Sequence, residues 1–185
     1  GFITRTDSGI DNVHELVGKR ISMDPYNIEL LDCLKSEGLL QNKFQIVGQS
    51  FITNKLLTGE ADAIGGFILN HTADLTNTGM GFRIFSPQTS GVDFYGDSLY
   101  TTEAFIKANP QVPDAFVKAS RKGWEAAFRD TDGTIKLIRE KYNHALSEER
   151  LQYEAQFIRD LIMPGSVDIG FINPRRWNHI AQVYA

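Results

Sequence analysis

The chain has 185 residues, of which 42% are hydrophobic and 23% are charged, and its formal net charge is −4. These values are ordinary for one globular domain or two small lobes. The interspersed charges exclude the dense Lys and Arg surface that nucleic-acid binding requires, so no nucleic-acid partner is expected. The single cysteine, Cys33, excludes an internal disulfide framework, and its apolar neighbours predict a buried, unreactive thiol.

Strand and helix signals alternate through the first half of the chain. Strands are expected at 19–23, 44–47, 61–65 and 82–85, and helices at 28–36, 51–57 and 67–76. Asp24, followed by Pro25, is expected to cap the first helix and Ser50 the second, while Gly38 and Gly59 end them. This spacing predicts an α/β lobe with a largely parallel, or mixed, sheet.

The second half of the chain has the pattern of helices throughout. They are expected at 102–108, 113–128, 131–142, 147–162 and 174–184. The change from alternating strands and helices to helices alone, near residue 100, is the one compositional boundary of the sequence. The predicted architecture is therefore an α/β lobe followed by C-terminal helices.

The segment Gly91–Glu103, GVDFYGDSLYTTE, holds three aromatic residues, two glycines and two aspartates in a short run. We interpret it as an aromatic-rich strand that crosses into a helix. Such a segment is expected where a two-lobed protein passes its chain from one lobe to the other. This interpretation favours binding of a small molecule over its chemical transformation.

Candidate ligand-binding residues follow the ends of the expected strands. In open α/β sheets, ligands bind beyond the carboxyl ends of the strands and near the N-termini of helices. Three segments meet this description, 23–27, 49–53 and 65–70. Gly65 and Gly66 would let the backbone approach a ligand closely. Ordinary turns and helix caps are the competing explanation for the same residues.

Four aromatic side chains are candidates for walls that stack on a flat ligand, namely Tyr26, Phe67, Tyr95 and Tyr100. Tyr95 is the strongest of them, because alternation along a strand would place it on the face opposite to Phe94. Core packing is the competing interpretation for each ring.

Other patterns with possible chemistry have simpler explanations. The run Asp130–Gly133 resembles the start of a calcium loop, but Lys141 stands where the bidentate acid belongs, so a helix cap is expected. The four histidines lack the spacing of metal ligands, and no nucleophile, phosphate-loop or zinc-protease motif is present. Arg175 and Arg176 are expected to be solvated or paired with acids, and Trp177 to pack within its helix. No catalytic residue, metal or cofactor is expected.

Five runs of the sequence, taken in order, resemble the THI5/NMT1-like group of type II periplasmic solute-binding proteins. They are 16–21 (LVGKRI), 57–63 (LTGEADA), 91–97 (GVDFYGD), 119–127 (ASRKGWEAA) and 176–181 (RWNHIA). The resemblance covers nearly the whole chain, and the order of the runs is more specific than any one of them. It implies a two-lobed fold that closes on a small organic ligand, pyrimidine-like in many members.

The resemblance implies an extracytoplasmic domain that binds a small molecule, located in the periplasm or on the outer face of the inner membrane. The ending 167–177 is closer to members that form the sensor of a membrane signalling receptor. A sensor module, with a membrane-embedded part and a kinase or cyclase module elsewhere in the protein, is therefore the first expectation. A free substrate-binding protein of an ABC importer is the alternative.

Two further interpretations stay open. Eukaryotic relatives of the group are enzymes of pyrimidine (thiamine precursor) synthesis, which use an active-site histidine and bound iron. The motif for that chemistry is not matched in this sequence, so no enzyme is expected. A structural or interaction fragment without a small-molecule site is the last interpretation.

Compared with the family, a segment of about 80 to 100 residues, much of one lobe, has no counterpart in this sequence. We expect 19–94 to form the second α/β lobe. We expect 1–18 and 95–185, an inter-lobe strand and the C-terminal helices, to belong with the first lobe. The apolar surface left by the missing first-lobe segment predicts a partner, which is either that segment or a second copy in a homodimer.

Ten residues form the expected ligand-binding set. Backbone N–H groups would hold acceptor atoms of the ligand, aromatic rings would stack on it, and Asp97 would accept from a donor. The ten residues are Asp24, Tyr26, Asn27, Ser50, Gly65, Gly66, Phe67, Asn70, Tyr95 and Asp97.

Overall fold

The protein was analysed as a computed structural model, which describes residues 1–50, 52–163 and 165–184. The chain forms two compact units. Unit 1 comprises Gly1–Phe94 and Pro174–Ala185, and unit 2 comprises Tyr95–Asn173. The chain therefore passes between the units twice.

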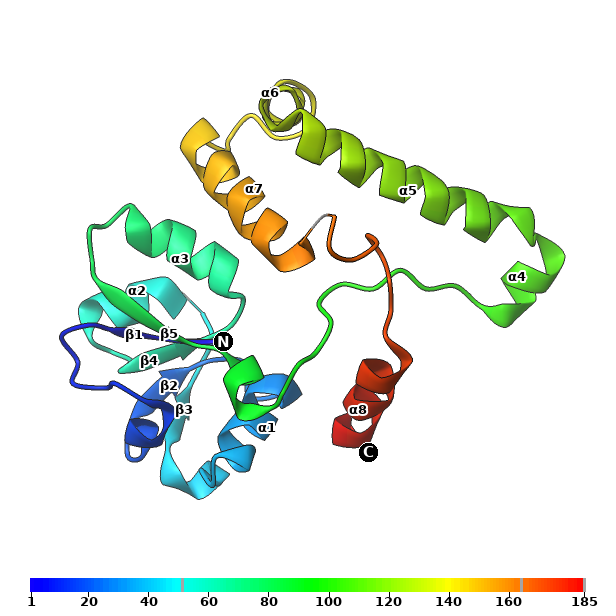
Figure 1. The fold of residues 1–185 in the computed structure, drawn as a ribbon. Helices are drawn as coiled ribbons and strands as arrows, with labels where there is room; N and C mark the ends of the chain where they lie inside the picture. The colour runs from blue at the N-terminus through cyan, green and yellow to red at the C-terminus, as the bar shows by residue number, and fades with distance from the viewer. Residues whose placement is uncertain (51, 164, 185) are drawn as a thin grey trace. The chain divides into compact units, whose positions relative to one another are not determined.

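Unit 1 is built on a five-stranded sheet with the order β3-β2-β4-β1-β5 (Figure 1). Its strands are β1 (Phe2–Arg5), β2 (Arg20–Ser22), β3 (Gln45–Val47), β4 (Ala63–Gly65) and β5 (Phe82–Phe85). Strand β2 pairs in parallel with β3 and β4, whereas β1 pairs antiparallel with β4 and β5. The expected α/β class is confirmed, and the sheet is mixed because β1 runs against both of its neighbours.

Strand β1 lies inside the sheet, where Phe2 is opposite both Gly65 and Phe85. Phe2 and Ile3 are both buried. Adjacent residues of a strand point to opposite faces, so a strand with two buried neighbours is covered on both faces. Strand β1 therefore shares a sheet with strands of 19–94, and the expected grouping of 1–18 with a first lobe stays a prediction. The expected grouping of 95–185 with a first lobe stays a prediction, although α8 in that range belongs to unit 1.

Four α-helices accompany the sheet in the described part of unit 1: α1 (Ile28–Ser36), α2 (Ile52–Thr58), α3 (Ile68–Thr76) and α8 (Pro174–Tyr184). Short 3-10 helices lie at η1 (Val13–Leu16), η2 (Gln41–Lys43) and η3 (Pro87–Ser90). The expected helix starting at Phe51 corresponds to α2, and Phe51 itself lies outside the described residues. Gly38 ends α1 with a φ of +78°, a conformation that glycine adopts without strain.

The cap of α1 differs from the one expected. Asn27, not Asp24, caps the helix, because its Oδ1 accepts from the backbone N–H of Leu30 at 3.1 Å. Asp24 instead accepts from the backbone N–H of Tyr26 at 2.9 Å. The carboxylate therefore shapes the turn around Pro25 that precedes the helix.

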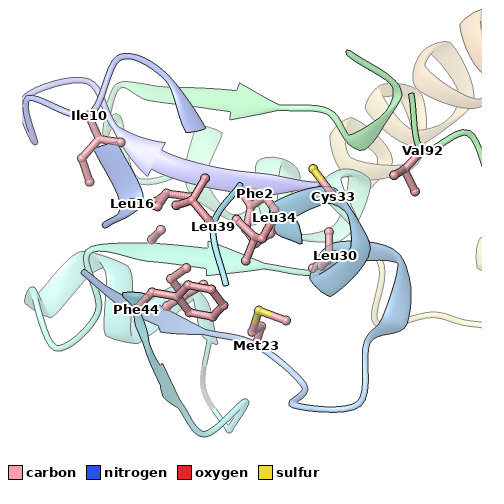
Figure 2. Packing of buried hydrophobic residues seen from close by; sticks show 12 residues of the cluster. Phe2, Ile10, Leu16, Met23, Leu30, Cys33, Leu34, Leu39, Phe44 and Val92 are labelled. Atoms are coloured by element: carbon pink, nitrogen blue, oxygen red, sulfur yellow. The ribbon is translucent and has the colours of Figure 1, made fainter. Parts of the chain in front are cut away.

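The core of unit 1 occupies both faces of the sheet. The larger cluster, on the α1 side, is drawn in Figure 2 and contains Phe2, Ile10, Leu16, Ile21, Met23, Leu30, Cys33, Leu34, Leu39, Phe44, Ala63 and Val92. The smaller cluster joins strands β1 and β4 to α2 and α3, and contains Ile3, Leu56, Ile64 and Leu75. Successive residues of β1 and β4 point to opposite faces of the sheet, so they contribute alternately to the larger and the smaller cluster.

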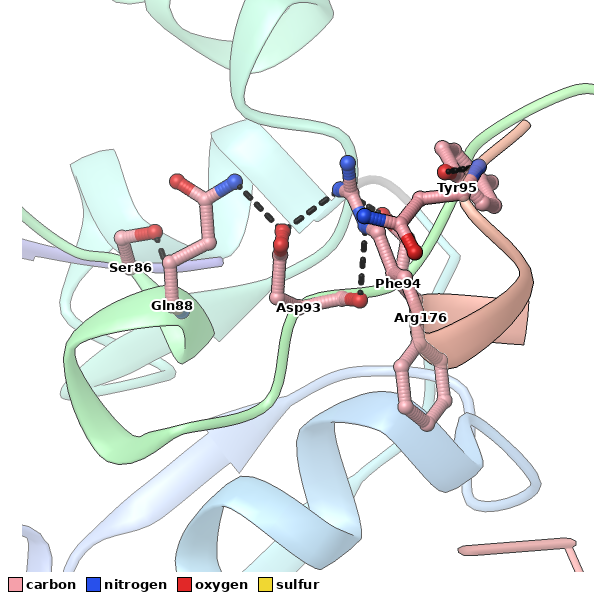
Figure 3. A network of polar contacts seen from close by, with 7 residues as sticks. Ser86, Gln88, Asp93, Phe94, Tyr95 and Arg176 are labelled. Carbon is pink, nitrogen blue, oxygen red and sulfur yellow. Dashed lines mark hydrogen bonds and ion pairs between the residues drawn. The ribbon is translucent and has the colours of Figure 1, made fainter. Parts of the chain in front are cut away.

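A polar network holds α8 in unit 1 (Figure 3). The Arg176 guanidinium donates to the Asp93 carboxylate at 2.5 Å, to the Asp93 carbonyl at 3.0 Å and to the Phe94 carbonyl at 2.9 Å. Gln88 Nε2 donates to the same carboxylate at 2.9 Å. At the other end of α8, the ring of Tyr184 lies 5.7 Å from that of Phe94. Of the two expectations for Arg176, solvation or pairing with an acid, the structure shows the second.

The described part of unit 2 contains the helices α4 (Glu103–Ala108), α5 (Gln111–Arg129), α6 (Thr131–Lys141) and α7 (Glu148–Ile162). Thr102, Asp130 and Ser147 cap α4, α6 and α7, since each side chain accepts from a backbone N–H of the first turn. Asp130 is therefore a helix cap, as expected. Among the described residues of unit 2, Ile135 and Leu151 are the buried hydrophobic ones.

The expected strand within Gly91–Glu103 is wrong. Gly91 ends η3 with a φ of +79°, and residues 92–102 follow as irregular chain without strand pairing. The carbonyls of Asp93 and Phe94 accept from Arg176 rather than from a neighbouring strand. Alternation along a strand therefore does not apply to Tyr95.

Candidate functional site

The carboxyl ends of β2, β3 and β4 meet at one edge of the sheet of unit 1, because the three strands are parallel neighbours. Ser22 Oγ, at the end of β2, donates to the carbonyl of Gly48, just beyond β3, at 2.9 Å. The segments 23–27, 49–53 and 65–70 follow these strand ends, with Phe51 outside the described residues. We name this region the carboxyl edge. Eight of the ten expected ligand-binding residues lie on it.

Two large aromatic side chains of the carboxyl edge are strongly exposed. Tyr26 is 86% exposed and Phe67 is 74% exposed. Tyr26 follows β2, and Phe67 precedes α3 directly after β4. Core packing, the competing interpretation from sequence, does not explain either ring. Exposed aromatic faces at the end of a sheet are suited to stacking on a flat or apolar part of a ligand.

Some polar residues of the carboxyl edge form hydrogen bonds within the chain, and others are exposed. Asp24 and Asn27 form the local hydrogen bonds of the turn and cap described above. Ser50 and Asn70 are exposed, the latter in the first turn of α3. Phe67 provides no side-chain hydrogen bond to the N-terminus of α3. The side chains of Ser50 and Asn70 are therefore exposed at the carboxyl edge, and their contact with a ligand stays a prediction.

The two adjacent glycines are explained by packing. A Cβ on Gly65 would lie 2.8 Å from Leu30 Cδ1 and 3.1 Å from Met23 Cβ, so a side chain there would collide with the core. A Cβ on Gly66 would lie 2.8 Å from His71 Nε2. From the sequence, both glycines were expected to let the backbone approach a ligand closely, with ordinary turns and caps as the competing explanation. The structure instead fills the space beside them with this chain's own side chains.

His71 and Thr53 were not among the expected site residues. His71 Nδ1 and Thr53 Oγ1 form a hydrogen bond of 3.1 Å, which joins the first turns of α2 and α3. Burial lowers the pKa of His71, and the nearby Asp74 carboxylate opposes this effect. A neutral imidazole thus stands at the carboxyl edge. The signal available in the sequence was the position of His71 in the first turns of the helix that follows Gly65 and Gly66.

The remaining expected residues, Tyr95 and Asp97, lie in unit 2. The Tyr95 hydroxyl accepts from the backbone N–H of Asn173 at 2.8 Å, so it joins the start and the end of unit 2. Asp97 is exposed, and Tyr100 is 90% exposed. The contact of these residues with a ligand stays a prediction.

Other titratable groups of unit 1 are accounted for by packing. Cys33 is 2% exposed and burial raises the pKa of its thiol, which confirms the expected buried cysteine. Burial also raises the pKa of Glu29, on the first turn of α1. Within the described residues, no group of three or more His, Cys, Asp or Glu side chains is arranged to hold a metal ion. None of the described helices combines the length and apolar character needed to cross a membrane.

Comparison with protein families identifies one match. The model of the family described as NMT1/THI5 like matches residues 1–133. A comparison with curated proteins found no significant match.

Comparison with solved structures finds periplasmic binding proteins. The sulfonate-binding protein SsuA of a putative sulfonate ABC transporter from Methylobacillus flagellatus KT has a TM-score of 0.60 and 23% identity over 83% of this chain. The aliphatic sulfonate-binding protein SsuA from Escherichia coli has a TM-score of 0.65 and 16% identity over 91% of this chain.

A third structure is the alkanesulfonate-binding protein SsuA from Xanthomonas axonopodis pv. citri bound to MOPS, with a TM-score of 0.59 and 17% identity over 84% of this chain. The chain spans 47%, 62% and 54% of the length of the three proteins, in the order given. At these identities the likeness establishes the fold, which is that of the type II periplasmic binding proteins.

Proposed function

The chain belongs to the NMT1/THI5-like family, and we propose that it is the solute-binding component of an ABC importer. It captures a small organic molecule on the outer side of the inner membrane and delivers it to the transporter. The ligand lies on the carboxyl edge of unit 1, the location favoured for ligands in open α/β sheets. Closure of a second lobe over the same ligand completes the site.

The observation that carries this proposal is the exposure of Tyr26 and Phe67 at the carboxyl edge. A folded domain with a well-filled core has no packing reason to leave two such rings at the end of its sheet. Tyr26 and Phe67 contribute apolar contact area, whereas Ser50 and Asn70 contribute hydrogen bonds. This combination suits a small organic molecule with a polar or anionic group.

The comparisons favour the importer over the sensor module that the end of the sequence suggested. All three solved structures are described as sulfonate-binding proteins, one of them as part of a putative ABC transporter. A small organic sulfonate is therefore the first ligand class to test, and a pyrimidine the second. The enzyme interpretation gains no support from these three relatives.

The three solved proteins are longer than this chain, so each contains a part that this chain does not match. Helix α5 of unit 2 has no buried residue, and Phe116 on it is 57% exposed. We propose that a first lobe, of the kind present in two-lobed binding proteins, covers this apolar face in the assembled molecule. A homodimer through the same face is the alternative.

The proposal is tested by calorimetric titration and thermal unfolding with two alkanesulfonates, MOPS and taurine, and two pyrimidines, uracil and cytosine. Saturable binding of at least one compound is expected. At 100 times the dissociation constant, a bound ligand adds about 2.7 kcal/mol to the free energy of unfolding. If none of the four compounds binds, the proposed solute classes are wrong.

The variants Tyr26→Ser and Phe67→Ser locate the site. Loss of a stacking ring is expected to weaken binding about 3- to 10-fold. Tyr142→Ser is the matched control, because Tyr142 is 77% exposed in unit 2 and far in sequence from every strand end. Unchanged affinity in both edge variants would move the ligand away from the carboxyl edge. Deletion of the gene is expected to abolish uptake of the bound solute, whereas a sensor would alter signalling and leave uptake intact.

A further inference from the structure

His71 is held against the carboxyl edge from two sides. Its Nδ1 bonds to Thr53 Oγ1 at 3.1 Å, and Thr53 lies in the first turn of α2. Its ring packs on Gly66, where a Cβ would come within 2.8 Å of Nε2 and 3.2 Å of Cδ2. The hydrogen bond fixes the Nδ1 side of the imidazole, and the missing side chain of Gly66 leaves room for the side that carries Nε2 and Cδ2. The ring orientation is therefore set before any ligand arrives.

The second ring nitrogen has no such partner. Within residues 1–50, 52–163 and 165–184, Nδ1 is the His71 atom that takes part in a side-chain hydrogen bond, and none reaches Nε2. The residue is half-buried. An imidazole with one nitrogen hydrogen-bonded and the other without a hydrogen-bond partner keeps that second nitrogen available to pair with a ligand.

The surroundings decide which hydrogen-bonding group suits this nitrogen. Burial keeps the ring neutral at neutral pH, so one nitrogen carries a hydrogen and the other accepts one. The N-terminus of α3, one turn before His71, lacks a side-chain cap and carries the positive end of the helix dipole. A ligand oxygen is favoured there over a ligand donor.

We infer that His71 is a ligand-contacting and specificity-determining residue, whose Nε2–H donates to an oxygen atom of the bound solute. The Thr53 hydroxyl donates to Nδ1 and so selects this tautomer. The inference rests on the proposed function, and it adds to it a requirement for an acceptor oxygen in the ligand. Sulfonate oxygens and the carbonyl oxygens of a pyrimidine both meet this requirement.

A first experiment reads the tautomer without any ligand. Two-bond ¹H–¹⁵N correlation spectra of the ¹⁵N-labelled protein distinguish a protonated from an unprotonated ring nitrogen. We expect His71 with Nε2 protonated and Nδ1 unprotonated at pH 7.5, and a mixture of tautomers in Thr53→Val. The opposite tautomer in the wild-type protein would overturn the inference, whatever the protein binds.

A second experiment uses two substitutions that separate the ring nitrogens. His71→Asn keeps a polar group near Nδ1 and removes the one at Nε2, whereas His71→Gln places an amide N–H close to the position of Nε2. With MOPS and uracil as probes, His71→Asn is expected to weaken binding about 3- to 10-fold and His71→Gln less than 3-fold, the range of one neutral hydrogen bond.

The outcomes separate this inference from the proposed function. Wild-type binding with the expected order of the two variants supports both. Wild-type binding that neither variant alters leaves the proposed function standing and overturns the contribution of His71. Equal losses in both variants, with unchanged urea midpoints, would also contradict an Nε2 contact. Absence of wild-type binding to all four compounds refutes the proposed solute classes, and the tautomer then decides the geometric part of the inference.

Discussion

Units 1 and 2 contain similar kinds of amphipathic helix but differ in what those helices bury. Of the 20 buried hydrophobic residues among those described, 18 lie in unit 1 and two, Ile135 and Leu151, in unit 2. Helix α5, with 19 residues, buries none of them. The sequence pattern of an amphipathic helix thus identifies a face that is suited to burial, and the partner for that face need not lie in the same unit.

The helices of unit 2 are held by local interactions and by polar contacts between helices, such as that of Arg159 Nη2 with the Phe128 carbonyl at 2.5 Å. Asp130 and Ser147 cap α6 and α7, and Asp114 and Lys118 form an ion pair of 2.7 Å one turn apart on α5. Such pairs contribute only about 0.2–0.5 kcal/mol each. In contrast, each fully buried side chain of unit 1 contributes several times that amount. The two units should therefore respond differently to the same kind of substitution.

The largest effect is expected from Leu34→Ala. Leu34 has no exposed surface in the larger core cluster, so its truncation should lower the free energy of unfolding by about 2–5 kcal/mol. Urea unfolding combined with hydrogen exchange of the sheet amides measures this loss. The matched control is Phe116→Ala on the exposed face of α5, with an expected change within about 0.5 kcal/mol. A cost at Phe116 as large as that at Leu34 would mean that α5 is covered in solution.

An intermediate effect is expected from Arg176→Ala. The side chain of Arg176 is 30% exposed, so we discount its ion pair with Asp93 and expect a loss of about 1 kcal/mol confined to α8. The amides of α8 should then exchange roughly 5-fold faster, while those of β4 keep their protection. Gln182→Ala, on the exposed surface of the same helix, is the control. Equal exchange in both variants would show that other contacts hold α8.

The smallest effect concerns acid stability. Hydrogen bonds from Arg20 hold the pKa of Asp62 below its ordinary value of 3.8. The unfolded chain therefore binds this proton more readily than the folded one, and stability rises with pH across this range. The contribution is complete above pH 3.8 and is lost as the pH falls through the lower pKa of the folded state.

The variant Asp62→Asn should flatten this part of the pH dependence. Urea midpoints measured between pH 6 and pH 2 provide the test. Arg20→Lys, which keeps the charge but loses the paired donors of the guanidinium, should give a partial change. An unaltered slope in Asp62→Asn would assign the acid sensitivity to other carboxylates.

Local features of this fold were predictable from sequence, whereas the pairing of distant segments was not. The bounds of α1, β5 and α8 agree with the expected ranges. The spacing of apolar residues, and the prolines and glycines that start or end an element, are signals that lie within a few residues of it. The insertion of β1 depends on residues about 60 to 80 positions later in the chain, and no local pattern encodes it.

In the candidate site, too, local features were predictable from sequence and contacts between distant segments were not. The exposed rings of Tyr26 and Phe67 follow from their positions after strand ends, which the sequence indicated. The bond between Thr53 and His71 forms only when α2 and α3 pack side by side, so the sequence gives no sign of it. Gly65 is ambiguous from sequence, because close approach of a ligand and a crowded core both favour glycine.

The position of β1 also constrains how the chain folds as it leaves the ribosome. Phe2 and Ile3 are synthesised before the other strands of this sheet, yet their partners Gly65 and Phe85 lie in its last two strands. Until β4 and β5 have been synthesised, the side chains of Phe2 and Ile3 have no sheet to pack into. They stay exposed to chaperones and to other nascent chains. Pulse-labelled hydrogen exchange during refolding should show the amides of β1 gaining protection together with those of β5 and no earlier.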